Sequence, residues 1–217
     1  MIPCSDSTEA RCAVPSSRAK RVICLLCWAL VVASGMGLMM RYELQPGRQT
    51  AASNQWPAGA PLSLDPKSAN LLVFAHPRCP CTRATITELE QVVRRCKDQV
   101  RVTVFFYQPH DAGPEWQQAS LWKQATQIPG VTVRSDVEGA VSKQFGAETS
   151  GQTLLFNGRG EQVFAGGITG ARGRVGANAG ESALVAGILH RVAAKKNTPV
   201  FGCSLLAMAS GLEWESL

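Results

Sequence analysis

The sequence lacks the short motifs that mark common nucleotide and metal sites. It contains no GxxxxGK[ST], no HExxH and no pair of CxxC motifs. Despite a net charge of +6, it has no Lys/Arg run interleaved with aromatic residues, so nucleic acid is not an expected partner. It also lacks internal repeats and low-complexity blocks. With 217 residues, 45% of them hydrophobic and 18% charged, the chain fits one folded domain with an appendage.

Cysteine is abundant but unevenly distributed. One set lies near the N-terminus and the other in the remainder of the chain: Cys4, Cys12, Cys24 and Cys27, then Cys79, Cys81, Cys96 and Cys203. The two sets need not share a redox compartment, so one disulfide count for the whole chain would mislead.

An uncharged run of 19 residues covers 22–40. It is long enough to cross a bilayer as a helix. Basic residues precede and follow it: Arg18, Lys20, Arg21 and Arg41. The positive cluster predicts that residues 1–21 are cytoplasmic and that the domain lies on the periplasmic or extracytoplasmic side of the cell inner membrane. A cleavable signal peptide is the alternative, since 32–34 offers small residues.

The rest of the chain predicts a linker, a domain and a tail. Residues 41–68 are rich in Pro, Gly, Ala and Ser and predict a linker. Residues 69–196 alternate strand and helix patterns, and 197–217 form a C-terminal tail. We expect strands at 70–75, 100–107, 131–134, 153–157 and 162–165, and helices at 81–96, 115–127, from the cap Asp136 to about 145, and at 181–196. This order predicts an α/β fold with a mixed sheet flanked by helices.

The run VFAHPRCPCTR places Cys79 and Cys81 where a strand ends and a helix begins. Unsatisfied N–H groups and the helix dipole at such a position lower a thiol pKa, and the thiolate is the reactive species. A metal site is the alternative: Cys79, Cys81 and His76, with Cys203 or His110, would suit Cu(I) or zinc.

The run VFAHPRCPC at this junction, the element order and the later TSGQTLLFNGRGEQVFAGG resemble the thioredoxin-like superfamily over residues 62–196. The stretches HPRCPCTR and GGITGARG also resemble bacterial membrane-anchored proteins named RedB. The resemblance implies that Cys79 is the nucleophile of a thiol–disulfide oxidoreductase acting on protein thiols or disulfides, with no cofactor.

Two departures from the thioredoxin pattern matter. Thr82 stands where the resolving cysteine is usual, so we expect Cys81 to resolve the mixed disulfide, with Cys203 as the alternative. We expect Thr82 to hydrogen-bond the thiolate. Gln152 stands where thioredoxins have a cis-proline, and a non-proline cis bond costs about 2.5–4 kcal/mol, so we expect a trans bond. A substrate-docking edge is expected at Gly151, Gln152 and His76. Because of the second departure, a non-catalytic thioredoxin-like interaction module is a further alternative.

Three further features are expected to have ordinary structural roles. Cys96 continues the apolar stripe of its helix and is expected to be buried. His76 precedes a proline and is expected to be an exposed loop histidine. The glycine-dense run 166–176 is expected to be a flexible loop that forms one wall of the site.

Overall fold

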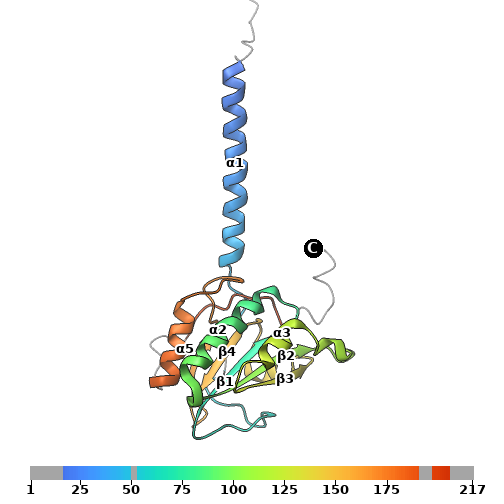
Figure 1. Cartoon of the computed structure of the whole chain (residues 1–217), viewed down its shortest axis with the longest axis vertical. Helices are drawn as coiled ribbons and strands as arrows, with labels where there is room; N and C mark the ends of the chain where they lie inside the picture. The colour runs from blue at the N-terminus through green and yellow to red at the C-terminus, as the bar shows by residue number, and fades with distance from the viewer. Residues whose placement is uncertain (1–16, 50–52, 191–196, 206–217) are drawn as a thin grey trace, which may run out of the picture. The chain divides into compact units, whose positions relative to one another are not determined.

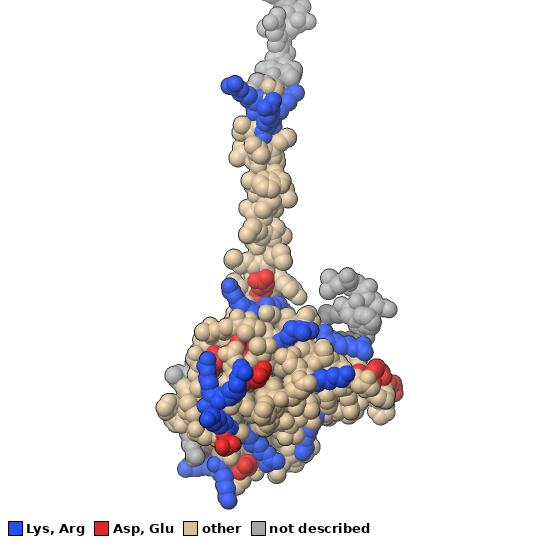
Figure 2. All heavy atoms as spheres, viewed as in Figure 1, with Lys and Arg blue, Asp and Glu red and all other residues tan. Residues whose placement is uncertain are grey.

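A long apolar helix opens the described part of the chain. The computed structural model describes residues 17–49, 53–190 and 197–205, and the chain divides in sequence between Tyr42 and Glu43 into two compact units. Helix α1, Ser17–Leu44, has 28 residues and none is buried. Its most apolar window has a mean hydropathy of 2.3, so it is long and apolar enough to cross a membrane. Figure 2 shows basic residues gathered where α1 begins, followed by an uncharged stretch.

The second unit is built on a five-stranded sheet in the order β3-β2-β1-β4-β5. Strands β1 (Ala69–Ala75), β2 (Val100–Gln108) and β3 (Val131–Val137) run parallel, whereas β4 (Gln152–Phe156) and β5 (Gln162–Gly166) form an antiparallel hairpin. β4 pairs antiparallel with β1. The predicted mixed sheet is therefore confirmed.

Helices cover both faces of this sheet. They are α2 (Pro80–Cys96), α3 (Ser120–Thr126), α4 (Ala140–Phe145) and α5 (Ala179–His190), with short 3-10 helices at Lys97–Gln99 and Pro114–Trp116. Figure 1 shows α2, α3 and α5 over the same face. The expected last helix began at 181 and ended at 196; of that range, 191–196 lies outside the described residues.

The alternation of side chains along β1 explains how both faces acquire a core. Leu71 and Val73 belong to the cluster that includes side chains of α2, α3 and α5. Leu72 and Phe74 point to the other face and pack in a cluster that includes Phe145 of α4. All four strand residues are at most 1% exposed. Because β1 is buried on both faces, it reads in sequence as one continuous apolar run.

The prediction of one continuous helix at 115–127 is wrong. A 3-10 turn at Pro114–Trp116 is separated from α3 by an extended residue, Ala119, with ψ of 143°. Trp116 belongs to the core cluster on one face of the sheet, whereas Leu121 belongs to the cluster on the other. Leu121 follows Trp116 by five residues, which corresponds to about 500° of rotation in a helix. In one straight helix the two side chains would therefore point about 140° apart around the axis, so the helix could not direct both into the core. The break allows both to be buried.

Asp136 contributes to the start of α4, although the helix begins later than predicted. Gly139 occupies the N-cap position with φ of 65°, and the helix starts at Ala140. The buried carboxylate of Asp136 accepts hydrogen bonds from the N–H groups of Val141 (2.7 Å) and Ser142 (3.0 Å). It therefore satisfies two amide groups that the first helical turn leaves without partners.

The segment expected to be a linker, 41–68, packs on the domain over much of its described length. The Trp56 ring lies 5.2 Å from both Phe145 and Phe156, between ring centroids, in edge-on contacts. The N–H of Trp56 donates to Gly160, and that of Gly47 donates to Val200. Apolar side chains spaced among Pro and Gly residues thus extend the core on the α4 face.

The expected C-terminal tail is also packed on the domain where it is described. Asn197 forms a bridge with Ala165 of β5, and Ser204 forms one with Thr149. Val200 and Leu205 are 0% exposed. The segment 197–205 therefore joins the edge of the sheet to the loop before β4, and we call it the C-terminal strap.

Candidate functional site

Cys79 lies at the junction of β1 and α2, as its place after the apolar run predicts. It is the N-cap residue of α2, in an extended conformation, and Pro80 follows at the first helical position. The N–H of Cys79 donates to His76 (3.1 Å), and the N–H of Thr82 donates to Cys79 (3.1 Å). Proline fits this position because the first N–H of a helix has no partner within the helix. The Cys79 side chain is fully buried.

Three sulfur atoms meet at this junction. The Sγ atoms of Cys79 and Cys203 are 3.2 Å apart, although the residues are 124 positions apart in sequence. Cys81 completes a group in which all Sγ atoms lie within 4.8 Å of one another. Cys79 and Cys81 are buried, and Cys203, on the C-terminal strap, is partly exposed. We call these residues the three-thiol cluster.

Ser150 connects the parts of the site, although no sequence motif marks it. Its hydroxyl accepts the N–H of His76 (2.9 Å) and lies 2.7 Å from the hydroxyl of Thr82. Its N–H donates to the carbonyl of Cys203 (2.8 Å). One buried serine therefore links the loop after β1, helix α2 and the C-terminal strap. The only sequence signal for this residue is its place just before β4.

The glycine-dense loop contributes Arg172 to the site. The Arg172 guanidinium donates to the carbonyl of Gly202 (2.8 Å), next to Cys203. Its positive charge also acts to lower the pKa of Cys81. The loop thus forms one wall of the site, and it holds the C-terminal strap against the helix start.

Hydrogen bonds within the cluster give its members different acidities. Hydrogen bonds from Cys203 and, to a smaller extent, from Cys81 lower the pKa of the Cys79 thiol far below its usual range. Burial raises this pKa, but its effect is smaller. The same bond to Cys79 raises the pKa of Cys203 above its usual range. For Cys81, the bond with Cys203 lowers the pKa, but the bond with Cys79, burial and the Cys79 charge raise it overall. Within the cluster, these contacts favour the thiolate on Cys79 over a thiolate on Cys81 or Cys203.

His76 is buried rather than exposed, which corrects the expectation. The side chain is 5% exposed and stacks on Tyr107, with ring centroids 5.7 Å apart and 18° between the planes. Trp116 contacts it edge-on, and the Arg78 guanidinium lies 4.3 Å from the Trp116 ring centroid. The His76 Nδ1 atom accepts the N–H of Arg78 (3.2 Å). These aromatic neighbours come from distant segments, which the local sequence does not reveal.

Burial lowers the pKa of His76 from 6.5 to about 4, and Cys79 and Arg78 make smaller, opposing contributions. His76 therefore takes up a proton near pH 6.5 in the unfolded chain, but only near pH 4 in the folded chain. This contribution to stability is complete above pH 6.5 and is lost as the pH falls from 6.5 towards 4. Between pH 7.5 and 4.5 the wild type is expected to lose about 2–3 kcal/mol more unfolding free energy than His76→Asn.

Denaturant unfolding of the full chain in detergent, at a series of pH values, measures this difference. Asparagine retains an acceptor near Nδ1 but does not titrate, and His110 and His190 are common to both proteins, so their contributions cancel. Parallel pH profiles for the wild type and the variant would contradict the assignment.

Gly151 and Gln152 are held in place by the fold. Gly151 has φ of 93°, and a Cβ atom there would lie 2.8 Å from the Thr85 hydroxyl. Its N–H donates to Phe74 (2.7 Å). The Gln152 side chain accepts from the N–H of Glu148 (3.1 Å) and donates to Gly146 (3.2 Å), away from the sulfur atoms. The bond before Gln152 is trans. The Gln152 amide is therefore engaged in the loop after α4.

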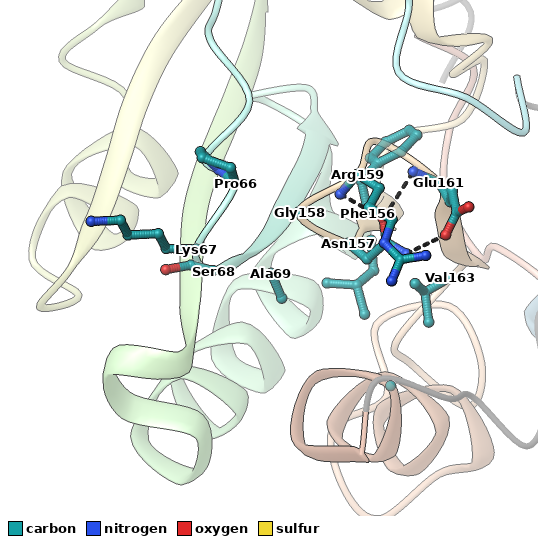
Figure 3. A pocket seen from close by; sticks show the side chains of 12 residues that line it. Pro66, Lys67, Ser68, Ala69, Phe156, Asn157, Gly158, Arg159, Glu161 and Val163 are labelled. Carbon is teal, nitrogen blue, oxygen red and sulfur yellow. Dashed lines mark hydrogen bonds between the residues drawn. The ribbon is translucent and has the colours of Figure 1, made fainter.

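Other candidate residues lie outside the cluster. Cys96 is fully buried in the core on the α2 face, and burial raises the pKa of its thiol. A cavity of about 350 Å³ lies between the start of β1 and the turn of the hairpin (Figure 3). It is lined by Ala69, whereas Cys79 follows the other end of the same strand, about 20 Å away. The sulfur chemistry is thus separate from this cavity.

Comparison with solved structures finds proteins of similar structure. The chain is similar to a hypothetical protein from Sinorhizobium meliloti 1021, with a TM-score of 0.54, 19% identity and coverage of 75% of this chain and 94% of that one. It is similar to an uncharacterized conserved protein from Geobacillus kaustophilus, with a TM-score of 0.54, 16% identity and coverage of 75% and 92%. A lipoprotein thioredoxin from Streptococcus pneumoniae matches with a TM-score of 0.42, 13% identity and coverage of 57% and 85%.

A comparison with protein-family profiles finds no match, and a search of curated proteins finds none either. The strand order and directions, with a cysteine at the β1–α2 junction, nevertheless define the class of the domain. It has a thioredoxin-like fold, as the sequence predicted, preceded by one helix that is a candidate membrane span.

Proposed function

We propose that the protein is a thiol–disulfide oxidoreductase that acts on protein thiols or disulfides through Cys79. The contact that carries the proposal is the 3.2 Å separation of the Cys79 and Cys203 sulfur atoms at the start of α2. A helix N-terminus favours a thiolate, and a neighbouring thiol can resolve the mixed disulfide that the thiolate forms. The proposed reaction requires no cofactor.

The exchange proceeds in two steps. The Cys79 thiolate attacks a sulfur atom of a partner disulfide, forming a mixed disulfide and releasing one partner thiolate. Cys203, once deprotonated, then attacks Cys79 Sγ, which forms a Cys79–Cys203 disulfide and releases the second partner thiolate. The partner gains two electrons and the protein loses two; the reverse sequence oxidises a partner dithiol.

Cys203 suits the resolving role better than Cys81 on geometric grounds. Cys203 approaches Cys79 from a separate segment, the C-terminal strap. A disulfide between Cys79 and Cys81 would close a small ring across Pro80, which restricts the dihedral angles that a disulfide prefers. Thr82 and Ser150 hold the loop and helix on either side of the reacting thiol.

Helix α1 is proposed to anchor this domain. Residues 22–40 would span the cell inner membrane, with residues 1–21 in the cytoplasm because basic residues cluster before the span. The domain would then lie on the periplasmic or extracytoplasmic side, where disulfides persist. Nucleic acid is not among the partners that we propose for this protein.

A redox titration with thiol trapping tests the exchange proposal. The full chain is prepared metal-free in detergent with Cys4 and Cys12 replaced by Ser and Cys24 and Cys27 by Ala. We call this protein the domain-cysteine background. It is equilibrated across a glutathione series, alkylated and mapped by mass spectrometry. We expect one two-electron transition linking Cys79 to Cys203, whereas absence of any disulfide within the three-thiol cluster at every potential would contradict the proposal.

A further inference from the structure

The three-thiol cluster also has the dimensions of a metal site. A metal–thiolate bond is about 2.3 Å long, so three sulfur atoms around one trigonal ion lie about 4 Å apart. Here the Cys79–Cys203 separation is 3.2 Å, and all three sulfur atoms lie within 4.8 Å of one another. Movements of less than about 1 Å, within the reach of side-chain rotation, would make the triangle regular.

The donor set indicates which metal would bind. Among the described residues, no His, Asp or Glu joins this group of sulfur ligands. His76, which the sequence suggested as a ligand, is not a member, and its Nδ1 atom accepts the N–H of Arg78. Sulfur-only donors select soft ions such as Cu(I), whereas protein sites for zinc are usually tetrahedral and need a fourth ligand.

The surroundings suit a compact anionic metal centre. Three thiolates and one monovalent copper ion carry a net charge of −2, and the Arg172 guanidinium acts on Cys81 from the adjacent loop. Cys79 and Cys81 are buried, which limits competition from water, whereas the partly exposed Cys203 leaves a side from which an ion can enter. The N–H of Ser150 and the Arg172 side chain hold the C-terminal strap that carries Cys203.

We propose that Cys79, Cys81 and Cys203 form a trigonal Cu(I) site. The proposal depends on the position of these sulfur atoms and not on the proposed exchange activity. The two states exclude each other, because a Cys79–Cys203 disulfide removes two of the three ligands. Oxidation of the two thiolates by a partner disulfide therefore releases the copper as Cu(I), with both electrons passing to the partner.

The test is an anaerobic titration of the reduced domain-cysteine background with Cu(I), in competition with a chromophoric Cu(I) chelator. We expect one Cu(I) per chain. Changes to groups around metal ligands typically lower affinity 10–100-fold, so removal of a ligand by Cys81→Ser or Cys203→Ser is expected to lower it more than about 100-fold. Cys96→Ser, a buried thiol outside the cluster, is the matched control and should change the affinity less than about threefold.

X-ray absorption spectroscopy of the copper-loaded background keeps the proposal testable if a variant folds poorly. Three sulfur neighbours at about 2.3 Å, with no nitrogen or oxygen neighbour, is the expected result. Two sulfur neighbours, a nitrogen neighbour, or unchanged affinity in Cys203→Ser would overturn the proposal. The metal-free redox titration is independent, so a normal Cys79–Cys203 transition with no copper binding would reject the metal site alone.

Discussion

Replacing Cys79 with serine is expected to lower the rate of thiol–disulfide exchange at the site by at least about a thousandfold, which corresponds to about 4 kcal/mol of activation free energy. The thiolate is the nucleophile, and a serine hydroxyl is not ionised at neutral pH. Cys81 and Cys203 are not expected to compensate, because neither occupies the N-cap position of α2 that Cys79 holds. Mixed-disulfide formation with a fluorescent glutathione disulfide, measured by acid quench in the domain-cysteine background, gives the rate.

Cys96→Ser is the matched control for this measurement. It removes a buried thiol that takes no part in the cluster, and we expect it to retain the rate within about threefold. A Cys79→Ser protein that reacted as fast as the control would assign the chemistry elsewhere. Cys203→Ser identifies the resolving group, because the mixed disulfide at Cys79 should then accumulate, whereas accumulation in Cys81→Ser alone would assign resolution to Cys81.

Replacing Gly202 with alanine is expected to separate Cys203 from Cys79 while leaving every thiol in the protein. A Cβ atom at Gly202 would overlap the carbonyl oxygen of Ser150, and backbone cannot rotate aside as a flexible side chain would. Overpacking of this kind costs about 1–3 kcal/mol. The C-terminal strap must move outward to relieve the overlap, so Cys79–Cys203 disulfide formation should slow by more than about tenfold.

Two measurements check this prediction: denaturant unfolding for stability, and disulfide mapping after a timed oxidation for the link to Cys203. Gly170→Ala is the control, because it lies in the loop beside Arg172 and its Cβ atom would meet Asn178 at an ordinary 3.6 Å. If Gly202→Ala formed the Cys79–Cys203 disulfide at the control rate, the strap would not position the thiol.

Much of the fold was predictable because its signals are local. The apolar run of β1 and the helical spacing of Ile86, Leu89 and Val93 identify a strand followed by a helix within a short stretch. The hairpin turn after Phe156 is marked by Asn157 and the following glycines. These patterns placed Cys79 at a helix start without knowledge of the tertiary structure.

The features that local patterns missed depend on distant parts of the chain. His76 is buried by Tyr107, which lies in β2, and by Trp116, which follows that strand. Trp116 also belongs to one core cluster and Leu121 to the opposite one, so the intervening chain breaks where propensity predicts one helix. The contact of Cys203 with Cys79 spans 124 residues, and no periodicity encodes such a separation.

The position of Cys203 also sets an order for biogenesis. Proteins are synthesised from the N-terminus, so Cys79 and Cys81 leave the ribosome long before Cys203 follows them. A nascent chain that stops short of residue 203 contains the helix start and both of its thiols, but lacks the third sulfur atom and the strap that carries it. The complete cluster therefore forms only after the chain has been made and folded as far as Cys203.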